Sequence, residues 1–67
     1  MEKYKVKATK EQLDSFGICY DIVGLVGTLK QKYPTGWYQL EIKHKIGGRE
    51  FTNDFDIPHT FLKKIND

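Results

Sequence analysis

Hydrophobic and polar residues alternate along three stretches of the chain, and each stretch predicts a β-strand. In KYKVKA, residues 3–8, apolar side chains alternate with lysines, as in a strand with one face on a core and the other in solvent. In WYQLEIKHKI, residues 37–46, the same alternation continues to the last position. The glycine pair at 47–48 then predicts a hairpin into a third alternating stretch, REFTNDFDI, residues 49–57.

The residues between these stretches predict a short helix and a further strand. Thr9 followed by Gln12 is a capping-box pattern, and it predicts a helix over residues 10–16. The apolar stretch ICYDIVGLVGTLKQKY, residues 18–33, predicts a long strand. The apolar residues of this stretch switch from even to odd positions near Val23–Gly24. A glycine at such a switch predicts a bulge or a sharp bend.

The elements together predict a mainly β protein, a single domain over residues 1–67. YPTG, residues 33–36, predicts a turn, and PHTFLKKI, residues 58–65, predicts either a short helical turn or a last brief strand. One short helix cannot cover a flat sheet, whereas a curled sheet encloses its own core, so we expect a small β-barrel of four to five strands with one short helical insert near residues 10–16. The expected core consists of Tyr4, Val6, Ile22, Leu29, Leu40, Ile42, Phe51 and Phe55.

Three short motifs resemble those of a known class of barrels. GLVGTL, residues 24–29, is similar to the G-x-x-G-x-V element of SH3-like barrels of the KOW type and of the ferredoxin–thioredoxin reductase variable chain. GWYQLEI, residues 36–42, resembles the strand that follows in those barrels, and IPHTFLKKI, residues 57–65, resembles their ending. The resemblance implies an SH3-like barrel, a fold that serves nucleic-acid contacts, subunit contacts and peptide binding.

Composition narrows the class of protein. Aromatic residues make up 13% of the 67 residues, which favours a folded domain with a small core. A single cysteine forms no disulfide within the chain and fits a reducing compartment. The first ten residues contain no apolar segment of a signal peptide, so we expect a cytoplasmic protein without a membrane span. Lysine greatly outnumbers arginine, as in the AT-rich genomes of many bacteria and phages.

Few residues suggest catalysis or metal binding. Cys19 is a potential nucleophile with His44 or His59 as its base, but its expected role is that of a small buried or half-buried thiol in a strand. Asp54 and Asp56 with the two histidines are potential metal ligands, but they lack the spacing of zinc sites.

The glycines and histidines of the strands have simpler expected roles. Gly24 and Gly27 resemble a phosphate-binding loop only superficially, because no helix opens after them, so we expect a strand bend. His44 lies on the apolar face of its strand and is expected to be a core-edge histidine with one hydrogen bond. We therefore expect no enzyme activity, no cofactor and no metal.

Two binding hypotheses from different classes remain. The chain carries 11 basic and 9 acidic residues, a mild excess that permits nucleic-acid binding without requiring it. Lysines beside an outward aromatic residue can hold a nucleic-acid backbone, although the same lysines also form an ordinary solvated face that protects a sheet edge. The residues of this hypothesis are Lys3, Lys5, Lys7, Lys43 and Lys45.

The other hypothesis rests on the single tryptophan. By alternation Trp37 faces outward, opposite to Tyr38, at the start of a strand and close to Tyr33. An outward tryptophan beside a tyrosine is typical of a binding hot spot, and the alternative is that Trp37 folds over a barrel end or covers the helical insert. The leading hypothesis is a non-catalytic module that binds a protein partner through Tyr33 and Trp37; the sequence leaves the partner and the oligomeric state open.

Overall fold

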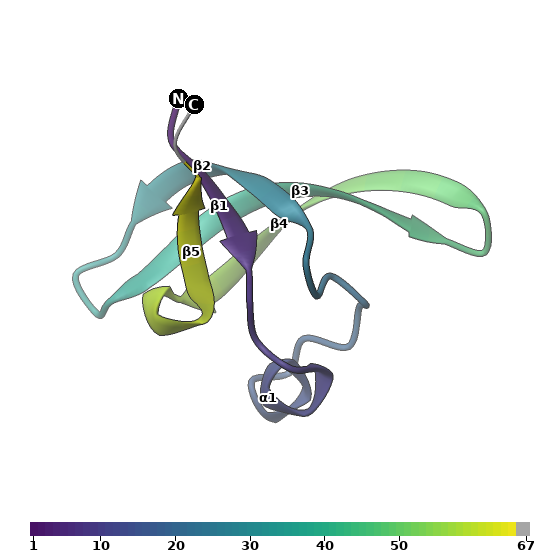
Figure 1. Cartoon of the computed structure of the whole chain (residues 1–67), viewed down its shortest axis with the longest axis horizontal. Coiled ribbons are helices and arrows are strands. Elements are labelled where there is room, and N and C mark those ends of the chain that lie inside the picture. The colour runs from purple at the N-terminus through teal and green to yellow at the C-terminus, as the bar shows by residue number, and fades with distance from the viewer. Residues whose placement is uncertain (66–67) are drawn as a thin grey trace.

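The structure, a computed structural model, describes residues 1–65 and consists of one sheet and one short α-helix (Figure 1). The predicted mainly β fold is confirmed: five strands pair antiparallel in a single sheet of order β4-β3-β2-β1-β5. In chain order the elements are β1 (Lys3–Val6), α1 (Lys10–Ser15), β2 (Val26–Lys32), β3 (Trp37–Ile46), β4 (Arg49–Pro58), the 3₁₀ turn η1 (His59–Phe61) and β5 (Leu62–Ile65).

The sheet is strongly curled. Figure 1 shows β1 and β5 running across the direction of β3 and β4, while the three-residue η1 joins β4 to β5. The two edge strands of the sheet are therefore linked by the chain itself, and side chains from all parts of the sheet meet in one core. This arrangement encloses a core between the strands, apart from the projecting end of the β3–β4 hairpin, and α1 adds Leu13 to it.

The short helix has the predicted cap. The Thr9 hydroxyl accepts a hydrogen bond from the Gln12 backbone N–H at 3.1 Å, and Gln12 Oε1 accepts one from the Thr9 N–H at 2.9 Å. A helix of six residues is marginal in isolation, so it depends on packing. Leu13 supplies that packing, because its side chain is fully buried in the core.

Both tight turns lie where the glycines predict them. Gly47 and Gly48 have φ of 57° and 82°, which fits a two-residue hairpin turn with both central residues in the left-handed region. In the turn of residues 33–36, the Gly36 N–H donates to the Tyr33 carbonyl at 3.1 Å, and the Tyr33 N–H donates to the Trp37 carbonyl at 2.8 Å. The end of the chain combines both predicted alternatives, a helical turn followed by a brief strand.

The predicted long strand over residues 18–33 is wrong in its first half. Only Val26–Lys32 forms a strand, and residues 18–25 are irregular. Gly24 has a φ of 80° and its N–H donates to the Val6 carbonyl at 2.8 Å, so the chain turns there rather than continuing as a bent strand. The apolar side chains Ile18 and Ile22 enter the core from this irregular segment instead of from a pleated face.

Gly27 allows β2 to approach β3 closely. A Cβ atom placed on Gly27 would lie 2.6 Å from Ile42 Cγ1 and 3.1 Å from the Glu41 carbonyl oxygen. The close packing of β2 on β3 therefore requires a glycine at position 27.

Most of the predicted core is buried. Tyr4, Val6, Ile22, Leu40, Ile42 and Phe55 lie in the core, and Leu29 packs against it at partial exposure. Phe51 is a wrong prediction: its side chain is 41% exposed, because the β3–β4 hairpin extends past the end of β2, as Figure 1 shows. The prediction omitted Ala8, Leu13, Ile18, Ile57 and Leu62, which are also buried.

β1 is an interior strand and not an edge. It pairs with β2 on one side and with β5 on the other, so its backbone is not free to pair with a strand of a second chain. Its lysines face solvent, as predicted, while Tyr4 and Val6 face the core. Among residues 1–65, no helix is both long and apolar enough to cross a membrane.

Candidate binding groove

A shallow groove of about 320 Å³ lies at the end of the sheet where β2 turns into β3. It is lined by Tyr33, Thr35, Trp37 and Asp56. Tyr33 and Thr35 belong to the predicted turn, Trp37 begins β3, and Asp56 lies near the end of β4. The structure thus brings the two predicted partner-binding residues, Tyr33 and Trp37, to one groove, and it adds the carboxylate of Asp56, which the sequence indicated only as a potential metal ligand.

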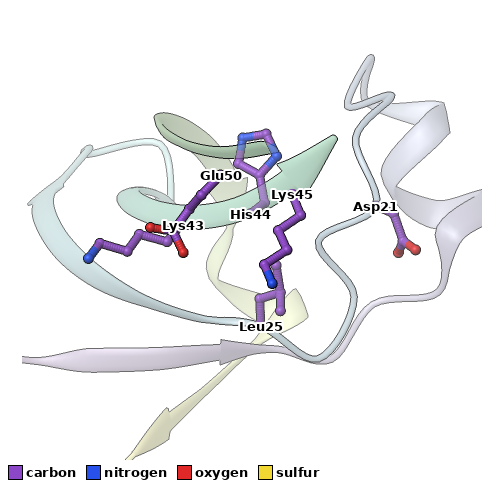
Figure 2. Close-up of a pocket in the computed structure, with 6 residues that line it drawn as sticks. All are labelled: Asp21, Leu25, Lys43, His44, Lys45 and Glu50. Atoms are coloured by element: carbon purple, nitrogen blue, oxygen red, sulfur yellow. The ribbon is translucent and has the colours of Figure 1, made fainter. Parts of the chain in front are cut away.

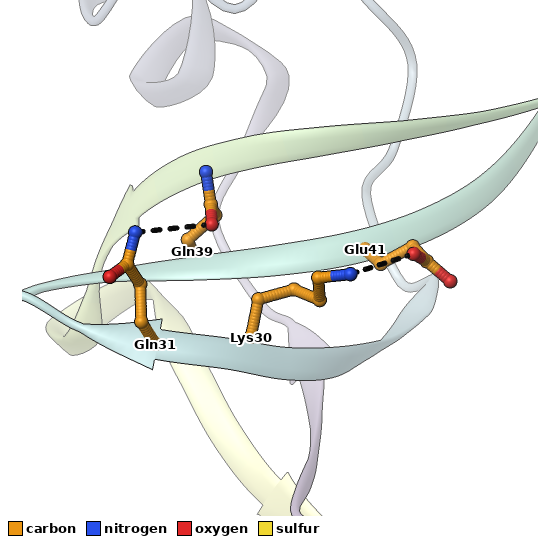
Figure 3. Close-up of polar contacts among 4 residues, drawn as sticks. All are labelled: Lys30, Gln31, Gln39 and Glu41. Atoms are coloured by element: carbon orange, nitrogen blue, oxygen red, sulfur yellow. Dashed lines mark hydrogen bonds and ion pairs between the residues drawn. The ribbon is translucent and has the colours of Figure 1, made fainter.

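A β-bulge in β2 places Tyr33 on this face. Leu29 lies opposite Leu40, but Gln31 lies opposite Gln39, so Lys30 is an extra residue in the pairing with β3. Figure 3 shows the result: Lys30 and Gln31, although adjacent in the chain, both reach outer-face partners on β3. Without the extra residue, alternation from Leu29 would turn Gln31 and Tyr33 toward the core.

A chain of hydrogen bonds fixes the Tyr33 ring. The Tyr33 hydroxyl donates to Asp56 Oδ1 at 3.1 Å and accepts from Gln31 Nε2 at 3.1 Å. Gln31 Nε2 also donates to Gln39 Oε1 at 3.3 Å, and the adjacent Lys30–Glu41 ion pair spans the same two strands at 3.3 Å (Figure 3). The groove wall is therefore held by β2, β3 and β4 together.

The electrostatics of the groove are those of an acidic site. Desolvation of the hydroxyl and its hydrogen bond to Asp56 raise the pKa of Tyr33 above its ordinary value of 10.0, and the nearby charges of Asp56 and Asp54 raise it further. Asp54 and Asp56 both face solvent on β4. No basic side chain of residues 1–65 lies within ion-pair distance of either carboxylate.

Trp37 is half-buried, and the predicted contact with the helical insert is observed. Its ring meets Phe16, at the end of α1, edge to face at 5.2 Å, and Phe16 meets Phe61 in the same way at 5.4 Å. The tryptophan therefore covers the helical insert with one part of its surface. The remainder lines the groove beside Tyr33.

The turn itself is anchored to η1. The Gly36 carbonyl accepts hydrogen bonds from the His59 backbone N–H at 3.0 Å and from His59 Nδ1 at 2.8 Å. The His59 ring also stacks on Tyr38 at 5.7 Å. These contacts give His59 a structural role, because they hold the turn that carries Thr35 in place.

The structure divides the five predicted nucleic-acid-binding lysines into two groups. Lys3 and Lys5 project from the outer face of β1, Lys5 lies directly opposite Lys63 of β5, and Lys7 follows β1. Lys43 and Lys45 are exposed on β3 beyond its pairing with β2. The outer face between the groups carries Thr28 and the Lys30–Glu41 pair, so the five lysines do not form one continuous basic surface.

A second hollow, of about 350 Å³, lies beside the open side of β3 (Figure 2). Two acids and two lysines contribute to its wall, so its charge is balanced. Its histidine, His44, is 3% exposed, and its Nε2 forms a 2.7 Å hydrogen bond with Asn53 Oδ1, which confirms the predicted core-edge role. The lining residues are Asp21, Leu25, Lys43, His44, Lys45 and Glu50.

The predicted role of Cys19 is wrong. The thiol is exposed and does not lie in a strand. Cys19 belongs to the irregular segment between α1 and β2, before the chain returns to the sheet. Among the residues that the structure describes, no three histidine, cysteine or acidic side chains gather as a metal site. The candidate ligands are dispersed: His59 binds the Gly36 carbonyl, and Asp56 accepts from Tyr33.

The fold and the groove define a small mainly β protein with an aromatic and acidic surface site. Comparisons of the chain with protein-family models, curated proteins and solved structures find no match. The resemblance of residues 18–65 to SH3-like barrels stays a prediction.

Proposed function

We propose that this chain is a non-catalytic binding module that holds an extended segment of a protein partner in the groove of Tyr33, Thr35, Trp37 and Asp56. One observation supports the proposal. The Tyr33 ring, whose hydroxyl is hydrogen-bonded to Gln31 and Asp56, lines the groove next to the half-buried Trp37. Rigid aromatic side chains that line an open groove bind at low entropic cost, because their rotamers are already fixed.

Residues of an extended segment project alternately to opposite sides, so one side chain can enter such a groove while its neighbours remain in solvent. The SH3-like resemblance agrees with this mode, because aromatic residues at one barrel end hold extended segments in many domains of that type. The groove opens between the turn of residues 33–36 and the end of β4.

A phage-displayed library of unbiased peptides, selected on the immobilised full chain, tests the proposal. We expect selected peptides to change the fluorescence of Trp37, the single tryptophan, and to lose at least tenfold in affinity for Trp37→Ala, because hot-spot aromatics typically contribute about 2 kcal/mol or more. Phe51→Ala is the matched control, since Phe51 is an exposed aromatic residue on the distant β3–β4 hairpin. Equal binding to wild type and Trp37→Ala would refute the proposal.

A second candidate function is nucleic-acid binding through the lysines of β1 and β5, chiefly Lys3, Lys5 and Lys63. The observation that favours it is the direct cross-strand pairing of Lys5 with Lys63, since like charges opposite each other are destabilising until an anion lies between them. Lys3 extends this group on the same strand.

A single-stranded DNA oligonucleotide titrated at several salt concentrations tests the second candidate. Binding at low salt that weakens steeply with added salt, and that Lys5→Ala reduces more than Lys10→Ala, is the expected result. Absence of binding at low salt contradicts it.

A further inference from the structure

The groove of the proposed function pairs an aromatic wall with carboxylates that have no basic partner within residues 1–65. Asp56 accepts one hydrogen bond, from the Tyr33 hydroxyl, through Oδ1. Asp54 precedes it by two residues on the same outer face, and its charge acts on the same hydroxyl. Glu41, directly opposite Asp54 on β3, differs from them because it is paired with Lys30, and Glu2 is paired with Lys32 and Lys64.

We infer that the groove is selective for a cationic side chain of the partner segment, arginine before lysine; this rests on the proposed function. Charge complementarity carries the inference, because Asp56 lines the groove, Asp54 lies two residues before it on the same face, and neither carboxylate has a basic side chain of residues 1–65 within ion-pair distance. The aromatic residues add to it, since a cation over the face of Trp or Tyr is attracted by the ring quadrupole.

Arginine fits the geometry better than lysine. A planar guanidinium stacks flat on an aromatic ring. Its N–H groups point outward within the plane of the guanidinium, so they can still donate to a carboxylate at its edge. In this groove Trp37 supplies a ring surface and Asp56 supplies the acceptor, while the bond from Tyr33 fixes the carboxylate in place. A lysine ammonium can reach the carboxylate but lacks the planar surface for stacking.

The other surfaces of the chain carry weaker inferences. The hollow beside Lys43 and Lys45, where β3 extends past β2, has mixed charge. Lysines at an unpaired edge of a strand are also a common protection against aggregation. The lysines of β1 belong to the second candidate function. Cys19 is exposed, but within residues 1–65 it belongs to no group of three histidine, cysteine or acidic side chains that could hold a metal ion.

Matched peptides test the inference. The tightest peptide from the unbiased selection is synthesised with its arginine retained, replaced by lysine, and replaced by citrulline, which keeps the shape and removes the charge. We expect arginine to be enriched in the selected pool, citrulline to weaken binding about tenfold, as for a hydrogen bond to a charged group, and lysine to be intermediate.

The protein variants separate charge from shape. Asp56→Asn should weaken the arginine peptide about tenfold and leave the citrulline peptide unchanged, while Asp54→Asn, which lies farther along the strand, should have a smaller effect. Thr52→Ala is the control, since Thr52 shares the outer face of β4 but lines no part of the groove.

Failure of the inference and failure of the proposed function give different results. If Trp37→Ala abolishes peptide binding but Asp56→Asn does not alter it, or if the selected pool is neutral or acidic, the groove binds peptides without the inferred selectivity. If no peptide binds wild type better than Trp37→Ala, both the proposed function and the inference are overturned.

Discussion

At the scale of single residues, the site depends on side chains held by specific partners. Tyr33 shows this most clearly, because its hydroxyl joins Gln31 on β2 to Asp56 on β4. Trp37 is fixed from the other side by Phe16. The sequence identified the two aromatic residues of the groove, and alternation identified Trp37 as outward. It did not identify Asp56 as their neighbour, since only strand pairing brings residue 56 beside residue 33.

Titration of Tyr33 tests the groove geometry directly. Because its folded pKa is raised, the neutral phenol contributes stability at pH values below about 10 that is lost as the pH rises through the folded pKa. We expect Asp56→Asn to lower the Tyr33 pKa toward 10.0, measured by phenolate absorbance. Tyr33→Phe assigns the transition among the four tyrosines, and an unchanged titration in Asp56→Asn would contradict the hydrogen bond.

Gly27 offers a second test at this scale. Gly27→Ala should lower the free energy of unfolding by about 1–3 kcal/mol, because the added methyl group overlaps Ile42 and the β3 backbone. Urea denaturation measures the loss. In an Ile42→Ala background the same substitution should cost less, since one of the overlapping side chains is gone; an equal cost in both backgrounds argues against the close contact.

At the scale of elements, local patterns predicted the structure where local interactions determine it. The capping box, the Gly-Gly hairpin and the alternation of residues 37–46 all correspond to observed elements. In residues 18–33, by contrast, the pattern predicted a strand more than twice as long as the observed one, Val26–Lys32. The apolar residues of this stretch suit either a strand or an irregular segment packed on a core, and periodicity alone does not separate the two.

The helix cap gives a prediction at the element scale. Thr9→Ala should lower the free energy of unfolding by about 0.5–2 kcal/mol, because it removes the acceptor for the Gln12 N–H at the start of α1. Lys10→Ala is the control, since Lys10 is exposed in the same turn, and we expect it to change stability by only a few tenths of a kcal/mol, as is usual for surface substitutions. Urea denaturation of both variants measures the difference, and an equal loss in both would argue against the cap.

At the scale of the whole molecule, charged side chains join the strand ends that lie opposite the β3–β4 hairpin. Glu2 pairs with Lys64 at 3.1 Å and with Lys32 at 3.8 Å, which links the beginning of β1 to the ends of β5 and β2. The Lys32 ammonium also lies 5.2 Å from the centre of the Tyr38 ring. The charged side chains of Glu2, Lys32 and Lys64 are exposed, so salt is expected to weaken the contacts between them.

The pH dependence of stability tests this network. The hydrogen bond from Lys64 holds the pKa of Glu2 below its ordinary 4.5, so the pair stabilises the fold above about pH 4.5 and this contribution is lost as the pH falls through the lowered pKa. We expect Glu2→Gln to lower the thermal midpoint at neutral pH, and the difference from wild type to vanish in acid. Glu50→Gln, at the far hairpin, is the control; a difference that persists in acid would contradict the ion pairs.

The sequence by itself determined the mainly β class, the capped helix, both tight turns and the outward position of Trp37, because each follows from periodicity, turn chemistry or caps within a few residues. Only the tertiary structure decided the rest. The bulge at Lys30 turns Tyr33 to the outer face, the register of β3 with β4 places Asp56 beside it, and the end of α1 packs Phe16 on Trp37. These three features depend on contacts between segments that are distant in the chain. In a strand, one extra residue moves every following side chain to the opposite face of the sheet.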